Sequence, residues 1–213
     1  MKPLLLLLGL LSLPFCQLSF ADDAPPPAKA SAPPPAPAPA PAAKNTGPVD
    51  VQFTTNMGNF VIELNAERAP LTVAHFLKLV DDGHFNGTIF HRVVPNFVIQ
   101  AGGFDAHYNT VPAGTKIVNE SGNGLSNTRT TVGMARGSEP HGADGQFYIN
   151  LYDNAALDPS QTRWGYAVFG KVIAGMEVVD RIGNVATGSH APLKEDTPLK
   201  PVIIQKAERI AAP

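Results

Sequence analysis

From residue 49 onward, the chain carries about eight short segments in which apolar and polar residues alternate, and only two with helical spacing. Short strands at this density, without a regular alternation of strand and helix, indicate a closed antiparallel barrel or a sandwich rather than a parallel sheet. The pattern alone leaves the choice between those two open. The expected strands cover residues 49–54, 60–64, 90–94, 97–103, 131–135, 146–150, 166–172 and 201–207, and the expected helices cover residues 70–82 and 176–182.

The first 21 residues have the organisation of a secretory signal peptide. Lys2 precedes a leucine-rich run from Leu4 to Leu13, and the segment ends in Ser19-Phe20-Ala21. A basic start, a short apolar core and small residues before the cut predict cleavage after Ala21. The apolar run falls short of the roughly 20 residues that a spanning helix needs, so we expect no stable membrane span. The expected destination is a bacterial periplasm.

The chain has one cysteine, Cys16, which lies inside the predicted signal peptide. Lipidation of Cys16 is an alternative, but a lipoprotein signal usually has a small residue before the cysteine, and Phe15 is bulky. If the signal peptide is removed after Ala21, the mature protein has no cysteine. A disulfide, a thiolate zinc site and a cysteine nucleophile are then all excluded.

Residues 22–48 consist almost wholly of alanine and proline. Such a segment cannot bury an apolar core, and it samples extended polyproline conformations, so we predict a disordered linker. A plain spacer is favoured over a ligand for a proline-recognising domain. One folded domain is expected over residues 49–210, and its expected state is a monomer. The formal net charge of −2 argues against a nucleic-acid partner.

The stretch from Phe90 to Gly103 reads as two strands joined by a Pro-Asn turn. A period of two places Phe90, Arg92 and Val94 on one face of the first strand. The Arg92 guanidinium would then lie against apolar surface, which is costly unless another interaction offsets it. A purely structural arginine, paired with a carboxylate or with backbone carbonyls, is one explanation.

The same residues support a second explanation. Residues 90–102 read Phe-His-Arg-x-x-Pro-x-Phe-x-x-Gln-x-Gly, which closely resembles the signature of the cyclophilins, the peptidyl-prolyl cis/trans isomerases. Further blocks at residues 134–135, 146–150, 157–158 and 168–172 match the family in the same order. The resemblance implies a mainly β fold, an eight-stranded closed antiparallel barrel capped by two α-helices. It also implies an enzyme that acts on proline-containing polypeptides and assists their folding.

The resemblance also implies roles for particular residues. Arg92 would be catalytic, and Gln100 would orient the peptide. The remaining substrate-binding residues would be the proline pocket formed by Phe97, Val98, Tyr148 and Leu157, its rim at Tyr166, and Met134, Ala135 and Gln146 along the adjoining surface. Rotation about the peptide bond breaks no covalent bond, so no metal or cofactor is expected. The chain departs from the common family pattern at Val98 (often Met), Tyr148 (usually Phe), Tyr166 (His in many eukaryotic members) and Arg136 (Asn in many of them).

Two other function classes fit less of the sequence. A peptide-binding module or holdase would keep the pocket without turnover, and an isomerisation assay separates it from an enzyme. A hydrolase is disfavoured because no Gly-x-Ser-x-Gly pattern occurs. The histidines are scattered, without the short paired spacing of a zinc-binding helix. His91 is expected on the strand face opposite Arg92, which favours a packing role over catalysis.

Overall fold

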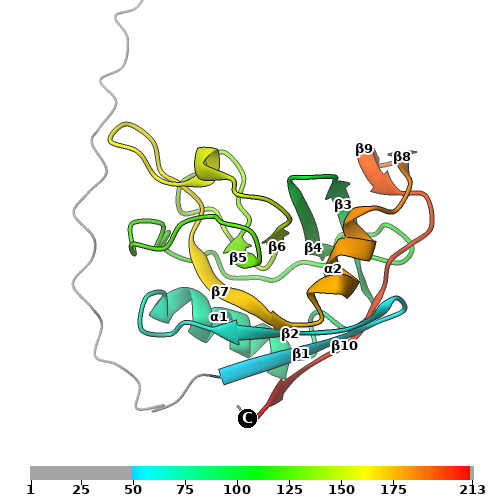
Figure 1. Cartoon of the computed structure of the whole chain (residues 1–213), viewed down its shortest axis with the longest axis horizontal. Coiled ribbons are helices and arrows are strands. Elements are labelled where there is room, and N and C mark those ends of the chain that lie inside the picture. Colours follow the sequence, from blue (N-terminus) through cyan, green and yellow to red (C-terminus); the bar gives the residue numbers. More distant parts are fainter. Residues whose placement is uncertain (1–48, 212–213) are drawn as a thin grey trace, which may run out of the picture. The chain divides into compact units, whose positions relative to one another are not determined.

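The computed structural model of the chain describes residues 49–211, apart from the side chain of Lys194 (Figure 1). The predicted signal peptide and linker lie outside the described residues. The strands are β1 (Val49–Thr55), β2 (Gly58–Leu64), β3 (Thr88–Val94), β4 (Val98–Asp105), β5 (Thr131–Met134), β6 (Phe147–Asn150), β7 (Val168–Ala174), β8 (Thr187–His190), β9 (Leu193–Pro198) and β10 (Ile204–Ile210). The helices are α1 (Pro70–Asp81), α2 (Met176–Gly183) and the 3₁₀ turn η1 (Ala155–Leu157).

Eight of the strands form one curled antiparallel sheet in the order β10-β1-β2-β7-β5-β6-β4-β3. The mainly β composition and both predicted helices are therefore confirmed. The pairing order leaves β10 and β3 as the terminal strands. Two backbone hydrogen bonds still join these edges, from the Gly87 N–H to the Ile204 carbonyl (2.8 Å) and from the Phe90 N–H to the Val202 carbonyl (2.9 Å). The strand pairing alone does not make this sheet a fully closed barrel.

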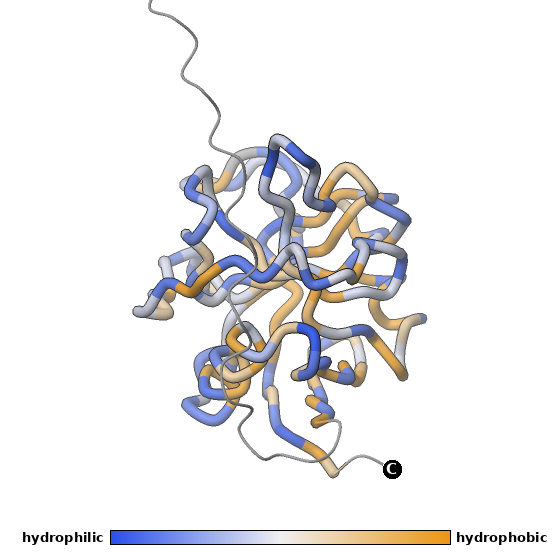
Figure 2. Tube along the Cα trace, turned by 90° about the vertical axis from the view of Figure 1, so that its left-hand side faces the viewer, coloured by the Kyte–Doolittle hydropathy of each residue, from blue (hydrophilic) through white to orange (hydrophobic). Residues whose placement is uncertain are grey.

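Aromatic rings fill the space inside the curve of the sheet. Phe53 and Phe60 face each other across β1 and β2, and their rings stack at a centroid distance of 5.1 Å. The ring centroid of Phe147 on β6 lies 5.3 Å from that of Phe53. Phe76 of α1 contacts Phe147 edge to face at a centroid distance of 5.6 Å. Figure 2 shows the apolar strand segments running through the middle of the domain, with polar loops outside. This core explains the strand alternation, because every second side chain enters it.

Helix α1 begins at Pro70, whose missing N–H costs nothing in the first turn of a helix. Ala69 offers no side-chain cap, and Glu120 from a distant loop takes that role. The Glu120 carboxylate accepts hydrogen bonds from the N–H groups of Leu71 (3.1 Å) and Thr72 (2.8 Å). A carboxylate at this end of a helix also complements the helix dipole.

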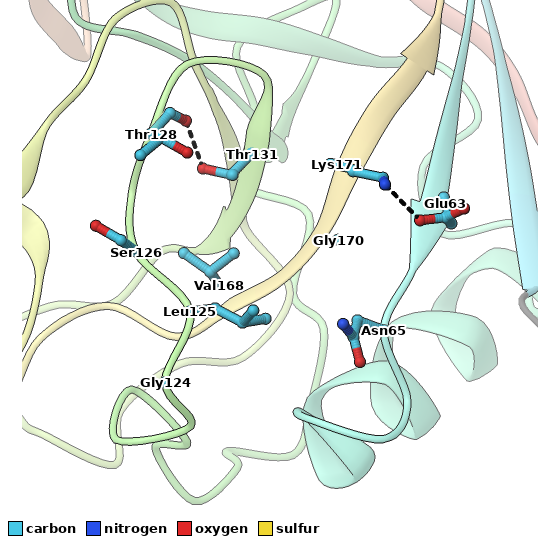
Figure 3. A pocket seen from close by; sticks show the side chains of 10 residues that line it. All are labelled: Glu63, Asn65, Gly124, Leu125, Ser126, Thr128, Thr131, Val168, Gly170 and Lys171. Atoms are coloured by element: carbon cyan, nitrogen blue, oxygen red, sulfur yellow. Dashed lines mark hydrogen bonds and ion pairs between the residues drawn. The ribbon is translucent and has the colours of Figure 1, made fainter.

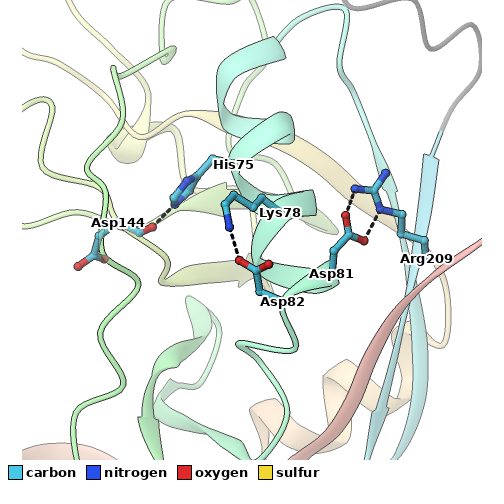
Figure 4. A network of polar contacts seen from close by, with 6 residues as sticks. All are labelled: His75, Lys78, Asp81, Asp82, Asp144 and Arg209. Carbon is cyan, nitrogen blue, oxygen red and sulfur yellow. Dashed lines mark hydrogen bonds and ion pairs between the residues drawn. The ribbon is translucent and has the colours of Figure 1, made fainter.

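Polar contacts attach the sides of α1 to its neighbours (Figure 4). Arg209 on β10 donates two parallel hydrogen bonds to the Asp81 carboxylate, and the Nε bond measures 2.7 Å. His75 contacts the backbone carbonyl of Asp144. The pairs therefore fix α1 against both the last strand and the loop that precedes β6.

Strands β8 and β9 form a separate hairpin that the sequence reading did not predict. Residues 187–198 contain a glycine and two prolines and lack the alternation of apolar and polar residues that predicts a strand. Strand β9 packs beside β3, and Figure 1 shows the hairpin next to that strand. His190 stacks on Tyr108 at a centroid distance of 3.8 Å. The hairpin therefore lies next to the strand that carries Arg92.

Candidate active site

A β-bulge in β3 decides where Arg92 points. The register shifts between Phe90, which pairs with Ala101, and Arg92, which pairs with Gln100. A bulge leaves one residue unpaired and changes the alternation of side chains. Phe90 is fully buried in the core, whereas the Arg92 side chain is 41% exposed. The prediction that Phe90 and Arg92 share a face is therefore wrong.

The Arg92 guanidinium lies at the surface with two neighbours. Its carbon is 5.8 Å from the centroid of the Phe97 ring. Its Nε is 3.7 Å from Oδ2 of Asp196 on β9, whose side chain is 40% exposed. That separation exceeds a hydrogen bond, and half-exposed ion pairs of this kind contribute little to stability. The pair with Asp196 therefore does not make Arg92 a purely structural residue.

A small apolar cluster lies beside Arg92, separate from the main core. Val98, Ala135 and Tyr148 are buried in it, and three partly exposed side chains pack against them, namely Phe97, Leu157 and Tyr166. Tyr148 pairs with Gly133 across β5 and β6, and a Cβ at Gly133 would overlap the tyrosine ring. The glycine thus leaves the space in which the ring lies. These six residues, from five segments of the chain, therefore lie together at one place.

Met134 is the exception among the residues expected at this surface. Its side chain is 2% exposed and belongs to the main core. The alternation of β5 explains this position, because Met134 pairs with the inward-facing Phe147 while Gly133 pairs with Tyr148. The expectation that the Met134 side chain lines the surface is therefore wrong.

Two amide side chains are linked to each other on the segments beside Arg92. Gln100, paired with Arg92 across β3 and β4, donates a 2.9 Å hydrogen bond from Nε2 to Oε1 of Gln146. This bond fixes the orientation of both amide groups, with Gln100 as the donor. The structure thus places Gln100 opposite Arg92 and joins it to Gln146.

Asn127, which the sequence did not indicate as a site residue, supports Tyr148 through a hydrogen bond. Its Oδ1 accepts a 2.6 Å hydrogen bond from the Tyr148 hydroxyl, and its Nδ2 donates one of 2.8 Å to Asp158. Burial raises the pKa of Tyr148 well above its usual value, so the hydroxyl stays protonated and donates. Burial also raises the pKa of Asp158, but hydrogen bonds from Ser126 and Asn127 outweigh it and hold that pKa below normal.

Removing only this hydroxyl, in Tyr148→Phe, is expected to destabilise the fold by about 1 kcal/mol. Asn127 keeps Asn150 as a donor, at 3.2 Å, so its oxygen is not left unpaired. The aromatic wall of the pocket also remains, so kcat/KM for a proline peptide should stay within about threefold of wild type. Urea unfolding and a peptide assay measure the two effects. A loss of activity above tenfold would mean that the hydroxyl acts on the substrate directly.

His91 is buried beside Arg92 and packs against Phe104 with the two rings tilted and their centroids 4.9 Å apart. Its Nδ1 has no hydrogen-bond partner among the described residues. Burial lowers the pKa of His91 to about 4, and the neighbouring Arg92 charge adds to this effect; contacts with the Ile89 backbone and the Gln146 side chain oppose it. The ring is therefore neutral at neutral pH, which fits the expected packing role.

This lowered pKa predicts a pH-dependent stability. The unfolded chain takes up a proton at His91 below about pH 6.5, whereas the folded protein resists doing so until about pH 4. The stabilisation is complete above pH 6.5 and is lost as pH falls toward 4, by at most about 3 kcal/mol. Urea unfolding at pH 7.5 and 4.5 should show a smaller difference in His91→Gln than in wild type. Equal pH dependence in both proteins would contradict the prediction.

A second depression lies on another part of the sheet (Figure 3). It has a volume of about 310 Å³, and its lining includes Glu63 and Lys171, whose side chains form a 3.0 Å ion pair. None of the residues expected to bind substrate lines it. We therefore place the candidate active site at the Arg92 cluster and not at this depression.

Residues 49–211 hold no group of three or more His, Cys, Asp or Glu side chains that could bind a metal ion. Within the same residues, no helix combines the length and the apolar character needed to cross a membrane.

These features define a class of site. An apolar cluster, a half-exposed guanidinium and two hydrogen-bonded amides lie together outside the main core of an antiparallel sheet, where they can contact an extended peptide. Activated nucleophiles pair with an adjacent base, and no such pair is found in this cluster. The arrangement suits an enzyme that acts on peptide conformation.

Comparison with known proteins identifies that enzyme. Residues 50–209 match the family described as cyclophilin type peptidyl-prolyl cis-trans isomerase/CLD. The chain is 46% identical over 165 residues to peptidyl-prolyl cis-trans isomerase A of Dickeya dadantii, covering 78% of this chain and 86% of that one. It is 46% identical over 158 residues to peptidyl-prolyl cis-trans isomerase B of Escherichia coli, covering 73% and 96%.

A solved structure agrees with these relatives. The Cryptosporidium parvum cyclophilin type peptidyl-prolyl cis-trans isomerase, determined in the presence of the dipeptide Ala-Pro, superposes with a TM-score of 0.61 at 25% identity. The match covers 76% of this chain and 99% of that chain. This chain therefore belongs to the cyclophilin family, and its activity is peptidyl-prolyl cis/trans isomerisation.

Proposed function

We propose that Arg92 is the catalytic residue of this isomerase and that Gln100 orients the peptide. Phe97, Val98, Tyr148 and Leu157 hold the proline ring, and Ala135, Gln146 and Tyr166 border the same groove. The observation that carries the proposal is the position of Arg92. A half-exposed guanidinium lies directly across from Gln100 and beside the only apolar cluster that the described residues form outside the main core.

The chemistry of the reaction explains why a guanidinium suits it. Rotation about the peptide bond faces a barrier of about 18–20 kcal/mol, because the nitrogen lone pair is conjugated with the carbonyl. In the twisted state, this lone pair returns to the nitrogen, which becomes a better hydrogen-bond acceptor. A donor aimed at that nitrogen stabilises the twisted state more than the planar one, and such a difference is what accelerates a reaction. A guanidinium also presents its donors in a planar, pre-organised fork.

The apolar cluster supplies the second requirement. A proline ring seated between Phe97 and Tyr148 cannot turn with the rest of the peptide, so rotation is confined to the carbonyl side. Burial of Val98 and Tyr148 (2% and 4% exposed) indicates a floor that is rigid and already formed. The partly exposed Phe97, Leu157 and Tyr166 are then the side chains that a bound ring would cover.

The test of this proposal is catalysis of exchange in a short peptide. NMR exchange spectroscopy on a tetrapeptide that contains Ala-Pro measures the cis/trans rate without a coupled protease. The choice of Ala-Pro follows the dipeptide named with the related structure. We expect substoichiometric protein to accelerate the exchange, which is otherwise a process of tens to hundreds of seconds. Binding without acceleration would favour a holdase instead.

The proposal extends to the surroundings of the enzyme. Residues 1–21 act as a signal peptide, residues 22–48 act as a linker, and the domain of residues 49–210 works as a monomer in the periplasm on exported proline-containing proteins. Slow proline isomerisation can limit the folding of such proteins. The bonds between the edges of β3 and β10 support a sheet that closes as a barrel.

Fractionation of bacterial cells that express the full chain tests the proposed location. We expect the protein in the periplasmic fraction, with a mass that corresponds to cleavage after Ala21. Recovery of the uncleaved chain in the cytoplasmic fraction would contradict both the location and the signal peptide.

A further inference from the structure

Arg136 lies at the rim of the proposed proline pocket and is held there by several contacts. Its guanidinium carbon is 4.7 Å from the centroid of the Tyr166 ring. It donates hydrogen bonds to the carbonyls of Trp164 (2.8 Å), Gly165 (3.3 Å) and Gly137 (3.0 Å). These contacts fix the guanidinium beside the pocket, where its charge partly opposes the rise that burial causes in the pKa of the Tyr148 hydroxyl.

Arg136 differs from the other arginines around the pocket in having no carboxylate partner among the described residues. Arg92 has the Asp196 carboxylate at 3.7 Å, and Arg163 lies beside Asp158 and lowers the pKa of that carboxyl. The ion pairs found within residues 49–211 do not include Arg136. Within the described residues, its positive charge is therefore balanced by three carbonyl dipoles and the Tyr166 ring, and not by a carboxylate.

Arg136 also retains donors. A guanidinium carries five N–H groups, one on Nε and two on each Nη. The three hydrogen bonds to carbonyls use one N–H on each nitrogen. Within the described part of the chain, one N–H on each Nη is left, and two such groups are the number that a carboxylate binds side by side.

We infer that Arg136 makes this groove selective for proline peptides that carry an acidic side chain next to the proline. The inference rests on the proposed function, because the groove must bind the peptide for its rim to read the neighbouring residue. A rim charge acts chiefly through electrostatic complementarity, so the selectivity should weaken as salt rises.

The experiment uses peptides that differ only in charge beside the proline. Glu, Gln and Lys are placed in turn immediately before the proline and, in a second set, immediately after it. Exchange spectroscopy gives kcat/KM for each peptide at low and high NaCl. At one of the two positions, we expect the Glu peptide to exceed the Lys peptide by roughly three- to tenfold at low salt, with Gln between them.

Variants then assign the selectivity to Arg136. In Arg136→Gln, the Glu/Lys ratio should fall to within about twofold, whereas Arg136→Lys should retain a preference for Glu because the charge remains. Lys206→Gln is the matched control, since it removes one positive charge from an exposed strand residue paired with Glu208. Its ratio should equal that of wild type.

Three results would overturn the inference. The first is a Glu/Lys ratio of kcat/KM near one at both positions in wild type. The second is a Glu/Lys ratio in Arg136→Gln that equals that of wild type. The third is an equal loss of kcat/KM for all peptides in Arg136→Gln, which would indicate a structural role alone. Failure of the proposed function looks different, because wild type would then accelerate exchange in none of the peptides.

Discussion

Replacement of Arg92 by alanine is expected to lower kcat about 100- to 1,000-fold, the usual effect of removing one preorganised donor from a transition state. KM should change by less than about threefold, because the apolar cluster that seats the proline ring remains intact. The fold should lose little stability, since the contact with Asp196 is long and half-exposed. Single-peptide exchange rates and urea unfolding separate these effects.

Two further variants make the Arg92 result specific. Arg92→Lys keeps the charge but loses the planar fork of donors, so it should recover only part of the activity. Arg129→Ala removes an arginine of similar exposure (43%) that pairs with Asp180, and it should leave kcat near that of wild type. Wild-type turnover in Arg92→Ala would reject the catalytic role.

The substitution Gly133→Ala is expected to reduce kcat/KM by tenfold or more and to destabilise the fold by about 1–3 kcal/mol, as overpacking does. The added methyl group would occupy the space of the Tyr148 ring, which lies directly opposite on β6. The ring must then leave its place in the pocket floor and lose its hydrogen bond to Asn127. The damage should appear mainly as a higher KM, in contrast to the effect at Arg92.

Gly122→Ala is the matched control for this substitution. Gly122 is exposed, and a Cβ there would have no atom within 4 Å. Its stability and activity should match those of wild type. The combination Gly133→Ala with Tyr148→Ala tests the mechanism, because removing the ring also removes the clash. If the double variant were no more stable than the sum of the two single changes predicts, the overlap with Tyr148 would not be the cause.

Alternation along the strands predicted much of the fold and of the pocket. Phe147 faces the core and Tyr148 the pocket, as a period of two requires. The same rule failed at Phe90 and Arg92, because a bulge depends on the pairing with β4 and leaves no mark in β3 itself. Met134 was misplaced for another reason: its expected position came from the resemblance, although the alternation of β5 points it inward.

Other parts of the site depend on contacts between distant segments. Asn127 reaches Tyr148 from a loop rich in Gly, Asn and Ser, and nothing local distinguishes it from the polar residues around it. Asp196 approaches Arg92 from a hairpin whose strands lack apolar alternation. The sequence shows that Arg136 differs from the asparagine common in the family, but it does not show that the Arg136 guanidinium lies over the Tyr166 ring.

The bulge in β3 has a consequence for how this enzyme tolerates change. The outward direction of Arg92 is set by its pairing with Gln100, and the extra residue at position 91 lets Phe90 stay buried whatever the chemical nature of that residue. Position 91 should therefore accept replacements of similar size. Gaining or losing a single residue between Arg92 and the turn at Asn96 would instead rotate the guanidinium away from the amides, even in a chain that still folds.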